Sequence, residues 1–187
     1  MTETDLQKHA AIVALIESLR EKGNWCGETN VQKTAYFVEI LSDHCLGLDF
    51  VLYKHGPFSF ELNELLSFMG ALRFLEDEIA NPRYGPRLRP NPDASKMLQG
   101  QFGKLSNKLK GVTAFVVDHL ASSGIVSVER LGTALYFTRQ ERIEDKQARA
   151  AQIHKVKPHI TEQDALQAVN EVDEILEEWS KVSKGQH

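Results

Sequence analysis

Residues 48–70, LDFVLYKHGPFSFELNELLSFMG, decide the fold. The run over residues 48–54 alternates apolar and polar side chains, which is the period of a β-strand. His55-Gly56-Pro57 then predicts a turn, because glycine permits a positive φ and proline disfavours helix in the residue before it. Ser59 is placed to cap a short helix that follows this turn and ends at Gly70. The apolar positions of that helix are Leu62, Leu65, Leu66 and Met69.

Two helices are expected before this stretch, and each begins with a capping box. In this motif an N-cap hydroxyl accepts a backbone amide, while a polar side chain three residues later bonds back to the cap. Thr4 with Gln7 predicts the start of the first helix. Thr29 with Gln32 predicts the start of the second in the same way.

The rest of the chain is expected to be a hairpin followed by helices. Two candidate strands lie near residues 72–76 and 84–89, joined through an Asn-Pro-Arg turn. Apolar side chains then recur at steps of three and four over residues 94–120, which predicts one continuous helix. Three further helices are expected, one capped at Ser127, one over residues 146–154 and one capped at Thr161.

These elements predict a mostly α fold with a small β component, an α+β class. The order helix, helix, strand, helix, hairpin in the first half has the outline of a winged helix. The turn-rich stretch at residues 90–93 is the natural place to divide the chain. We therefore expect residues 1–93 to form a winged-helix-like half that packs on a helical half, residues 94–187, in one compact unit.

The composition excludes several classes of protein. The chain of 187 residues is 42% hydrophobic and 26% charged, which is typical of a globular rather than a disordered protein. No stretch approaches the roughly 20 apolar residues of a membrane helix, and the N-terminus lacks the pattern of a secretory signal. Two cysteines, Cys26 and Cys45, do not make a disulfide framework. We therefore expect a folded cytoplasmic protein without a membrane partner.

Charge is unevenly distributed along the chain. The net charge of -4 argues against nucleic-acid binding over the whole surface. Residues 83–110 nevertheless carry seven basic side chains and one acid, whereas residues 161–187 carry seven acids and two lysines. These stretches are either solvated helix faces of opposite sign or a local patch for phosphate or an acidic partner. The acidic last helix docking on the basic one is a further alternative.

Motifs that carry chemistry are missing from the sequence. It contains no glycine-rich phosphate loop, no dinucleotide-binding fingerprint and no serine elbow. His44 and Cys45 are adjacent, and neighbours on a helix point about 100° apart, so they are poorly placed to share a metal. The sequence therefore predicts a protein that is not an enzyme, with no catalytic residues, no cofactor and no metal.

The winged-helix outline raises the question of nucleic-acid binding. In such domains the third helix enters the major groove, but here that helix carries Glu61 and Glu64 and no basic residue. The hairpin is better suited to phosphate or to an acidic partner, because guanidinium groups alternate with an aromatic ring. Its candidate residues are Arg83, Tyr84, Arg87 and Arg89. A winged-helix nucleic-acid-binding regulator is thus one alternative for the function.

Four segments together resemble a known family. They are residues 31–37 (VQKTAYF), 53–59 (YKHGPFS), 129–137 (ERLGTALYF) and 155–160 (KVKPHI). The combination is similar to the bacterial YwgA-like proteins and, more distantly, to the Panacea (SocA-like) antitoxin domain. Both place a QK-x-x-YF helix before a strand that ends in a Gly-Pro turn. The chain departs from the short Panacea domain by its long C-terminal helical half.

The resemblance implies a small, non-enzymatic cytoplasmic protein that acts by direct contact with a protein partner, such as a toxin or a regulated target. It supplies no catalytic residues, and self-association stays open. From the residues themselves, the four segments have a structural interpretation, in which Gln32 belongs to a cap and Gly56-Pro57 to a corner. The functional alternative is one exposed partner-binding groove lined by Gln32, Lys33, Tyr36, Tyr53 and His55.

Overall fold

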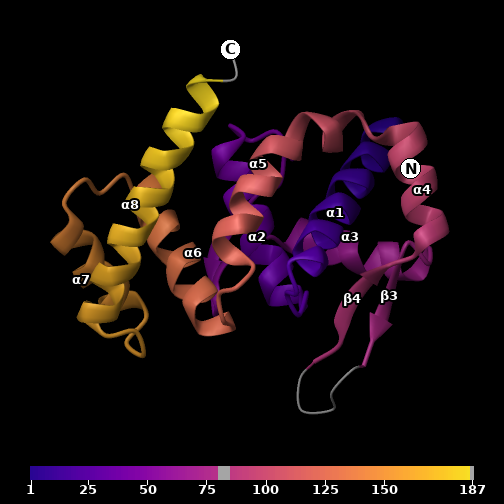
Figure 1. The fold of residues 1–187 in the computed structure, drawn as a ribbon. Coiled ribbons are helices and arrows are strands. Elements are labelled where there is room, and N and C mark those ends of the chain that lie inside the picture. Colours follow the sequence, from indigo (N-terminus) through magenta and orange to yellow (C-terminus); the bar gives the residue numbers. More distant parts are fainter. Residues whose placement is uncertain (80–84, 186–187) are drawn as a thin grey trace. The chain divides into compact units, whose positions relative to one another are not determined.

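The computed structural model describes residues 1–79 and 85–185 and confirms a mostly α fold with a small β component (Figure 1). Its helices are α1 (Glu3–Glu21), α2 (Glu28–Leu41), α3 (Phe60–Ala71), α4 (Pro92–Phe102), α5 (Lys104–Leu120), α6 (Ile125–Arg139), α7 (Lys146–Val156) and α8 (Glu162–Lys184). Its strands are β1 (Val51–Tyr53), β2 (Gly56–Phe58), β3 (Leu75–Glu78) and β4 (Arg87–Pro90). None of the helices in this part of the chain has the length and apolar character needed to cross a membrane.

The chain forms two compact units that do not follow a single cut in the sequence. The first comprises Met1–Phe50 and Ser59–Ser122, and the second comprises Val51–Phe58 and Ser123–His187. The division expected between residues 93 and 94 falls inside the first unit, within the first turn of α4. The reason is α1, whose apolar face packs against α2, α4, α5 and β4 together (Figure 1).

The expected strand over residues 48–54 is shorter than predicted and has a partner that the sequence pattern did not reveal. β1 covers three residues and pairs antiparallel with β2, so that Tyr53 lies opposite Gly56. Lys54 and His55 form the turn, and Gly56 and Pro57 already belong to the second strand. Gly56 has a φ of +86°, which explains why glycine stands directly after the turn.

Three of the expected helix starts are wrong, because an earlier residue takes the cap. Thr2 rather than Thr4 caps α1, in a capping box that Asp5 completes. Gly27, with extended backbone, precedes α2, so Thr29 lies inside the first turn. The cap of α6 is Gly124 rather than Ser127. The caps predicted at Ser59 and Thr161 are confirmed, since their hydroxyls accept the amides three residues later.

The helix predicted over residues 94–120 is in fact two helices, α4 and α5, that meet at Gly103. A side chain at this position would place its Cβ 2.3 Å from the carbonyl oxygen of Gln99. Such a contact is far inside van der Waals range, so the backbone can take this tight junction only with glycine. The apolar period continues across the junction, which is why the pattern alone indicated one helix.

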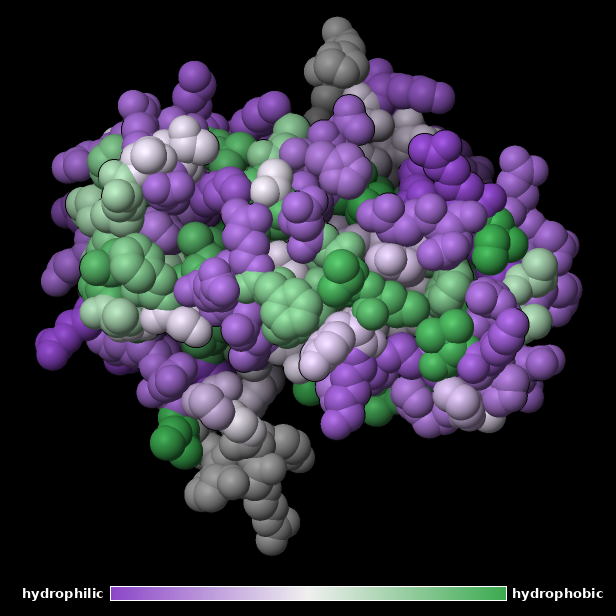
Figure 2. Space-filling model, turned by 180° about the vertical axis from the view of Figure 1, so that it is seen from behind, coloured by the Kyte–Doolittle hydropathy of each residue, from purple (hydrophilic) through white to green (hydrophobic). Residues whose placement is uncertain are grey.

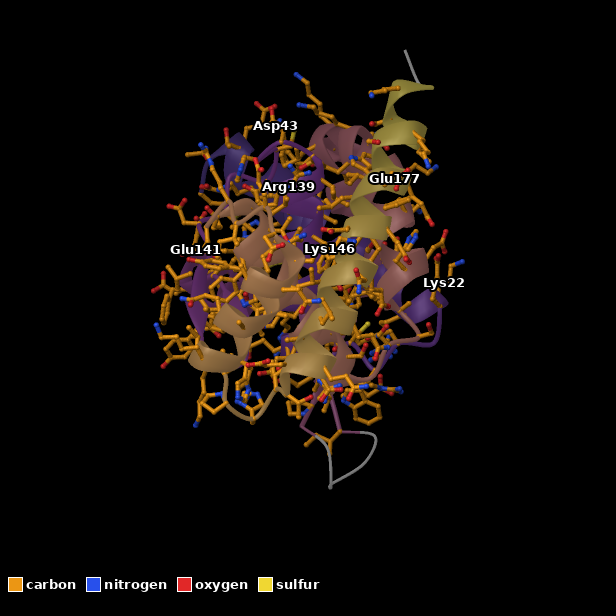
Figure 3. All side chains as sticks on the ribbon, turned by 90° about the vertical axis from the view of Figure 1, so that its left-hand side faces the viewer. Lys22, Asp43, Arg139, Glu141, Lys146 and Glu177 are labelled. Carbon is orange, nitrogen blue, oxygen red and sulfur yellow. The ribbon has the colours of Figure 1, made fainter. Side chains whose placement is uncertain are left out.

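In the second unit, α7 and α8 lie side by side and are joined by charged side chains (Figure 3). Lys146, at the start of α7, donates to Asn170 of α8 at 2.9 Å. The buried Arg149 donates from both terminal nitrogens to the two carboxylate oxygens of Asp173, at 2.7 and 2.8 Å. This two-pronged pair fixes the register of the two helices.

Candidate functional site

Three of the five residues expected in an exposed groove are buried. Gln32, Lys33 and Tyr36 in α2 are 1%, 2% and 0% exposed. The Gln32 side-chain amide donates to the carbonyl of Ser59 at 3.0 Å and accepts from its N–H at 2.9 Å. Tyr36 packs its ring 5.0 Å from that of Phe50. Burial therefore excludes these three side chains from an exposed surface, and Gln32 instead holds the residue that caps α3.

The other two residues, Tyr53 and His55, are exposed on the β1–β2 hairpin of the second unit. Tyr53 is 53% exposed, and its ring lies 5.6 Å from that of Phe58. The Nδ1 atom of His55 lies 3.5 Å from Oε2 of Glu129 in α6. The hairpin thus presents an aromatic ring and an imidazole to solvent.

Three residues around this hairpin were missed by the sequence analysis: Glu129, Lys157 and His159. Lys157 is buried, and its ammonium donates to the backbone carbonyls of Tyr53 and Lys54, which fixes the turn. Burial lowers the pKa of Lys157, and the charge of Glu129 acts against this shift. His159 lies 3.3 Å from the other oxygen of Glu129. Residues from three of the four segments that carry the family resemblance, 53–59, 129–137 and 155–160, therefore meet at this hairpin. Their separation in the sequence gave no sign of this contact.

The arginines expected to contact nucleic acid are engaged in ion pairs across the β3–β4 hairpin. Arg87 lies opposite Glu78 and donates to it at 2.6 Å, and Arg89 lies opposite Glu76 and donates to it as well. The hydrogen bond from Arg87 holds the pKa of Glu78 below its usual range. Arg20 donates to the same carboxylate. Arg87 and Arg89 are therefore paired with acids of the preceding strand. Those acids lie before residue 83, so the charge count over residues 83–110 did not include them.

Two other candidates from that hairpin, Arg83 and Tyr84, lie outside the described residues. The described strands carry three carboxylates on β3 and two guanidinium groups on β4. Acidic side chains thus outnumber basic ones on the described strands, and phosphate is repelled by such a balance. The ring of Trp25 lies 5.3 Å from the Arg87 guanidinium and orients it further.

A groove of about 680 Å³ lies between α3 and the β3–β4 hairpin, within the first unit. Its apolar lining comes from Leu66, Leu75 and Leu88. Glu28 and Asp77 also line it, are exposed, and have no ion-pair partner among the residues that the structure describes. The sequence could not show this groove, because α3 and the hairpin form it only when they are brought together.

Helix α3 also exposes large apolar side chains beside the groove. The side chains of Phe60 and Phe68 in the helix are 54% and 48% exposed, and that of Leu72, the residue just after the helix, is 38% exposed. Hydrophobic side chains gather over α3 in Figure 2, which views the molecule from behind. The carboxylate of Glu61 pairs with Lys8 at 2.8 Å, and the helix has no basic residue. This face can bury apolar surface of another protein but cannot neutralise phosphates.

Comparison with known proteins adds no assignment to this site. No family model matches the chain, and no curated protein shows significant sequence similarity to it. The chemistry of the site therefore comes from its own residues. They are an apolar floor, the exposed rings of α3, and a charged lining in which, among the described residues, Glu28, Glu76 and Asp77 outnumber the single exposed cation, Arg73.

Proposed function

We propose that this protein is a non-enzymatic, cytoplasmic interaction or regulatory module that acts, in the manner of an antitoxin, by direct contact with a partner protein. The contact surface consists of α3 and the groove beside it. The observation that carries the proposal is the exposure of Phe60 and Phe68 next to a groove of about 680 Å³. Contiguous exposed apolar side chains next to a concave surface are typical of protein-interaction sites.

Two further points support this proposal. The four segments that resemble the YwgA-like and Panacea proteins imply a protein of the same class. Such a protein neutralises a partner by direct contact or acts as an adaptor. Tyr53 and His55 are exposed on a hairpin that Lys157 holds in place, so they form a proposed second contact in the other unit. We keep both as partner-binding candidates, and we withdraw Gln32, Lys33 and Tyr36 because they are buried.

The test uses the tagged protein as bait in nuclease-treated lysate of the host cell. The α3 variant carries Phe60→Ser and Leu72→Ser. The matched control carries Ile125→Ser and Val126→Ser, which are apolar residues of the second unit and at least as exposed. We expect wild type and control to capture the same dominant protein and the α3 variant to capture at least about tenfold less, with unchanged melting temperature. Equal capture by the α3 variant would contradict the proposed surface.

A nucleic-acid-binding regulator is the second candidate, and one observation favours it. Four exposed lysines of α4 and α5 have no hydrogen-bond or ion-pair partner among the described residues, namely Lys96, Lys104, Lys108 and Lys110. They replace the hairpin arginines as the basic surface. Duplex binding that weakens steeply with salt, with a shallower slope after Lys104→Gln and Lys108→Gln, would favour this function. Lack of duplex binding at about 50 mM salt would exclude it.

A further inference from the structure

The backbone of Leu88 shows which edge of the β3–β4 sheet is open. Its N–H donates to the carbonyl of Cys26 at 2.9 Å, and its carbonyl accepts from Arg20 at 3.2 Å, so both groups point away from β3. Leu88 lies opposite Asp77. In an antiparallel ladder, pairs that exchange two hydrogen bonds alternate with pairs that exchange none. Asp77 therefore also directs its N–H and carbonyl away from its neighbour, toward the outer edge of β3.

The register of the neighbouring pairs agrees with this assignment. Two residues along the ladder, Pro90 lies opposite Leu75, and proline has no N–H to give to a partner strand. The bonded pairs are therefore Glu76 with Arg89 and Glu78 with Arg87. Within residues 1–79 and 85–185, the backbone of Asp77 has no hydrogen-bond partner at the outer edge. β4 is covered at its own outer edge, and β3 is open at Asp77.

The side chains along β3 select what can pair with that edge. The strand reads Leu-Glu-Asp-Glu, so a second copy adding antiparallel would place carboxylates opposite carboxylates, which is destabilising. Glu76 and Glu78 already have arginine partners from β4. Among the described residues the exposed Asp77 has no such partner, and it lines the groove together with Leu75 and Leu88. An incoming strand gains most from a lysine or arginine opposite Asp77 and from apolar side chains two residues to either side of it, on the face of Leu75 and Ile79.

We propose that β3 accepts an extended, lysine- or arginine-bearing segment of the partner protein as a third strand. Backbone groups of Asp77 supply the hydrogen bonds, its carboxylate pairs with the basic side chain, and Ile79, which is 74% exposed, covers an apolar neighbour. The inference rests on the proposed function, since it names the chemistry of the partner at the groove beside α3. It differs from that proposal in using the strand edge rather than the face of α3.

The probe is the five-residue peptide Val-Thr-Lys-Thr-Val, with Val-Thr-Glu-Thr-Val as control, added to purified, isotope-labelled protein and followed by NMR. Lysine opposite Asp77 then places the valines opposite Leu75 and Ile79, because side chains of a strand alternate between faces. We expect the lysine peptide to shift the β3 amide signals saturably and the glutamate peptide to leave them unchanged. Asp77→Pro removes the outward N–H without touching a ladder bond and should weaken binding about tenfold. Asp77→Asn keeps the N–H, removes the charge and should weaken binding less.

Each other outcome overturns the inference. If Asp77→Pro, with a wild-type melting temperature, binds the lysine peptide as wild type does, no strand is added at this edge. If neither peptide binds but wild type self-associates and Asp77→Pro does not, the occupant is a second copy. If neither peptide binds and no self-association occurs, the edge takes no strand at all. The peptide titration needs no partner from the host cell. Its failure would therefore contradict strand addition at β3, whereas equal capture by the α3 variant would contradict the proposed function.

Discussion

Replacing Arg149 by alanine is expected to lower the free energy of unfolding of the second unit by about 3 kcal/mol. Arg149 is 3% exposed, and its guanidinium donates to both oxygens of Asp173 and to the hydroxyl of Thr138 at 2.6 Å. Alanine leaves the carboxylate partly buried without this partner and a space between α7 and α8. Urea unfolding followed by Trp179 emission, in a Trp25→Phe background, reports on α8 and thus on this unit.

The same pair makes a prediction about pH. Burial alone would raise the pKa of Asp173, but the hydrogen bonds and charges of Arg149 and, to a smaller extent, of Lys146 outweigh it and hold that pKa below its usual value of 3.8. Because the pKa of Asp173 is lower in the folded state, its ionised form stabilises the folded protein above pH 3.8. This stabilisation is lost as the pH falls through the folded-state pKa. Arg149→Ala should therefore lose less further stability than wild type between pH 5 and about pH 2.

A conservative variant distinguishes the pair from simple packing. Arg149→Lys keeps the charge but has no planar fork, so it should fall between wild type and Arg149→Ala in unfolding free energy. Gln147→Ala, at an exposed position two residues earlier, is the control and should change little. If Arg149→Ala unfolds within about 0.5 kcal/mol of wild type, the pair does not hold α7 on α8.

Local signals in the sequence predicted the parts of the fold that depend on near neighbours. The caps at Ser59 and Thr161 need only a hydroxyl and an amide three residues later, and both are confirmed. The prediction of one continuous helix over residues 94–120 was wrong, because the spacing of apolar residues gives no information about steric contacts of the backbone. At Gly103 the decisive contact is with the backbone carbonyl of Gln99, and it arises only once the two helices have formed.

The candidate site depends on contacts across the chain, and there the sequence was a weaker guide. The pairing of Arg87 with Glu78 follows from the register of β3 and β4. Counting charges along a stretch of sequence gives no information about this register. The approach of His55 to Glu129 spans two segments that only the fold brings together. His55 lies in the turn that the local Gly-Pro signal predicted, and Tyr53 lies in the strand before it, as the alternating pattern predicted. Gln32 was misplaced because its partner, Ser59, is 27 residues away.

Replacing Gln32 by alanine is expected to lower the free energy of unfolding of the first unit by about 2–6 kcal/mol. Gln32 and Ser59 are 1% and 0% exposed, and the side-chain amide satisfies both the N–H and the carbonyl of Ser59. Without it, two buried backbone groups lose their partner, and each costs about 1–3 kcal/mol. Chemical unfolding followed by Trp25 emission in a Trp179→Phe background measures the loss.

The variant Gln32→Glu tests whether this geometry is the cause. A glutamate still accepts from the Ser59 N–H, but its second oxygen faces the Ser59 carbonyl, so at neutral pH it should be as damaging as alanine. A protonated carboxyl group donates to that carbonyl, so acidification should restore part of the stability. Gln32 would be a contact residue instead if Gln32→Ala kept its melting temperature and lost only the captured partner. Because Ser59 caps α3, the structural role predicts that stability and capture fall together.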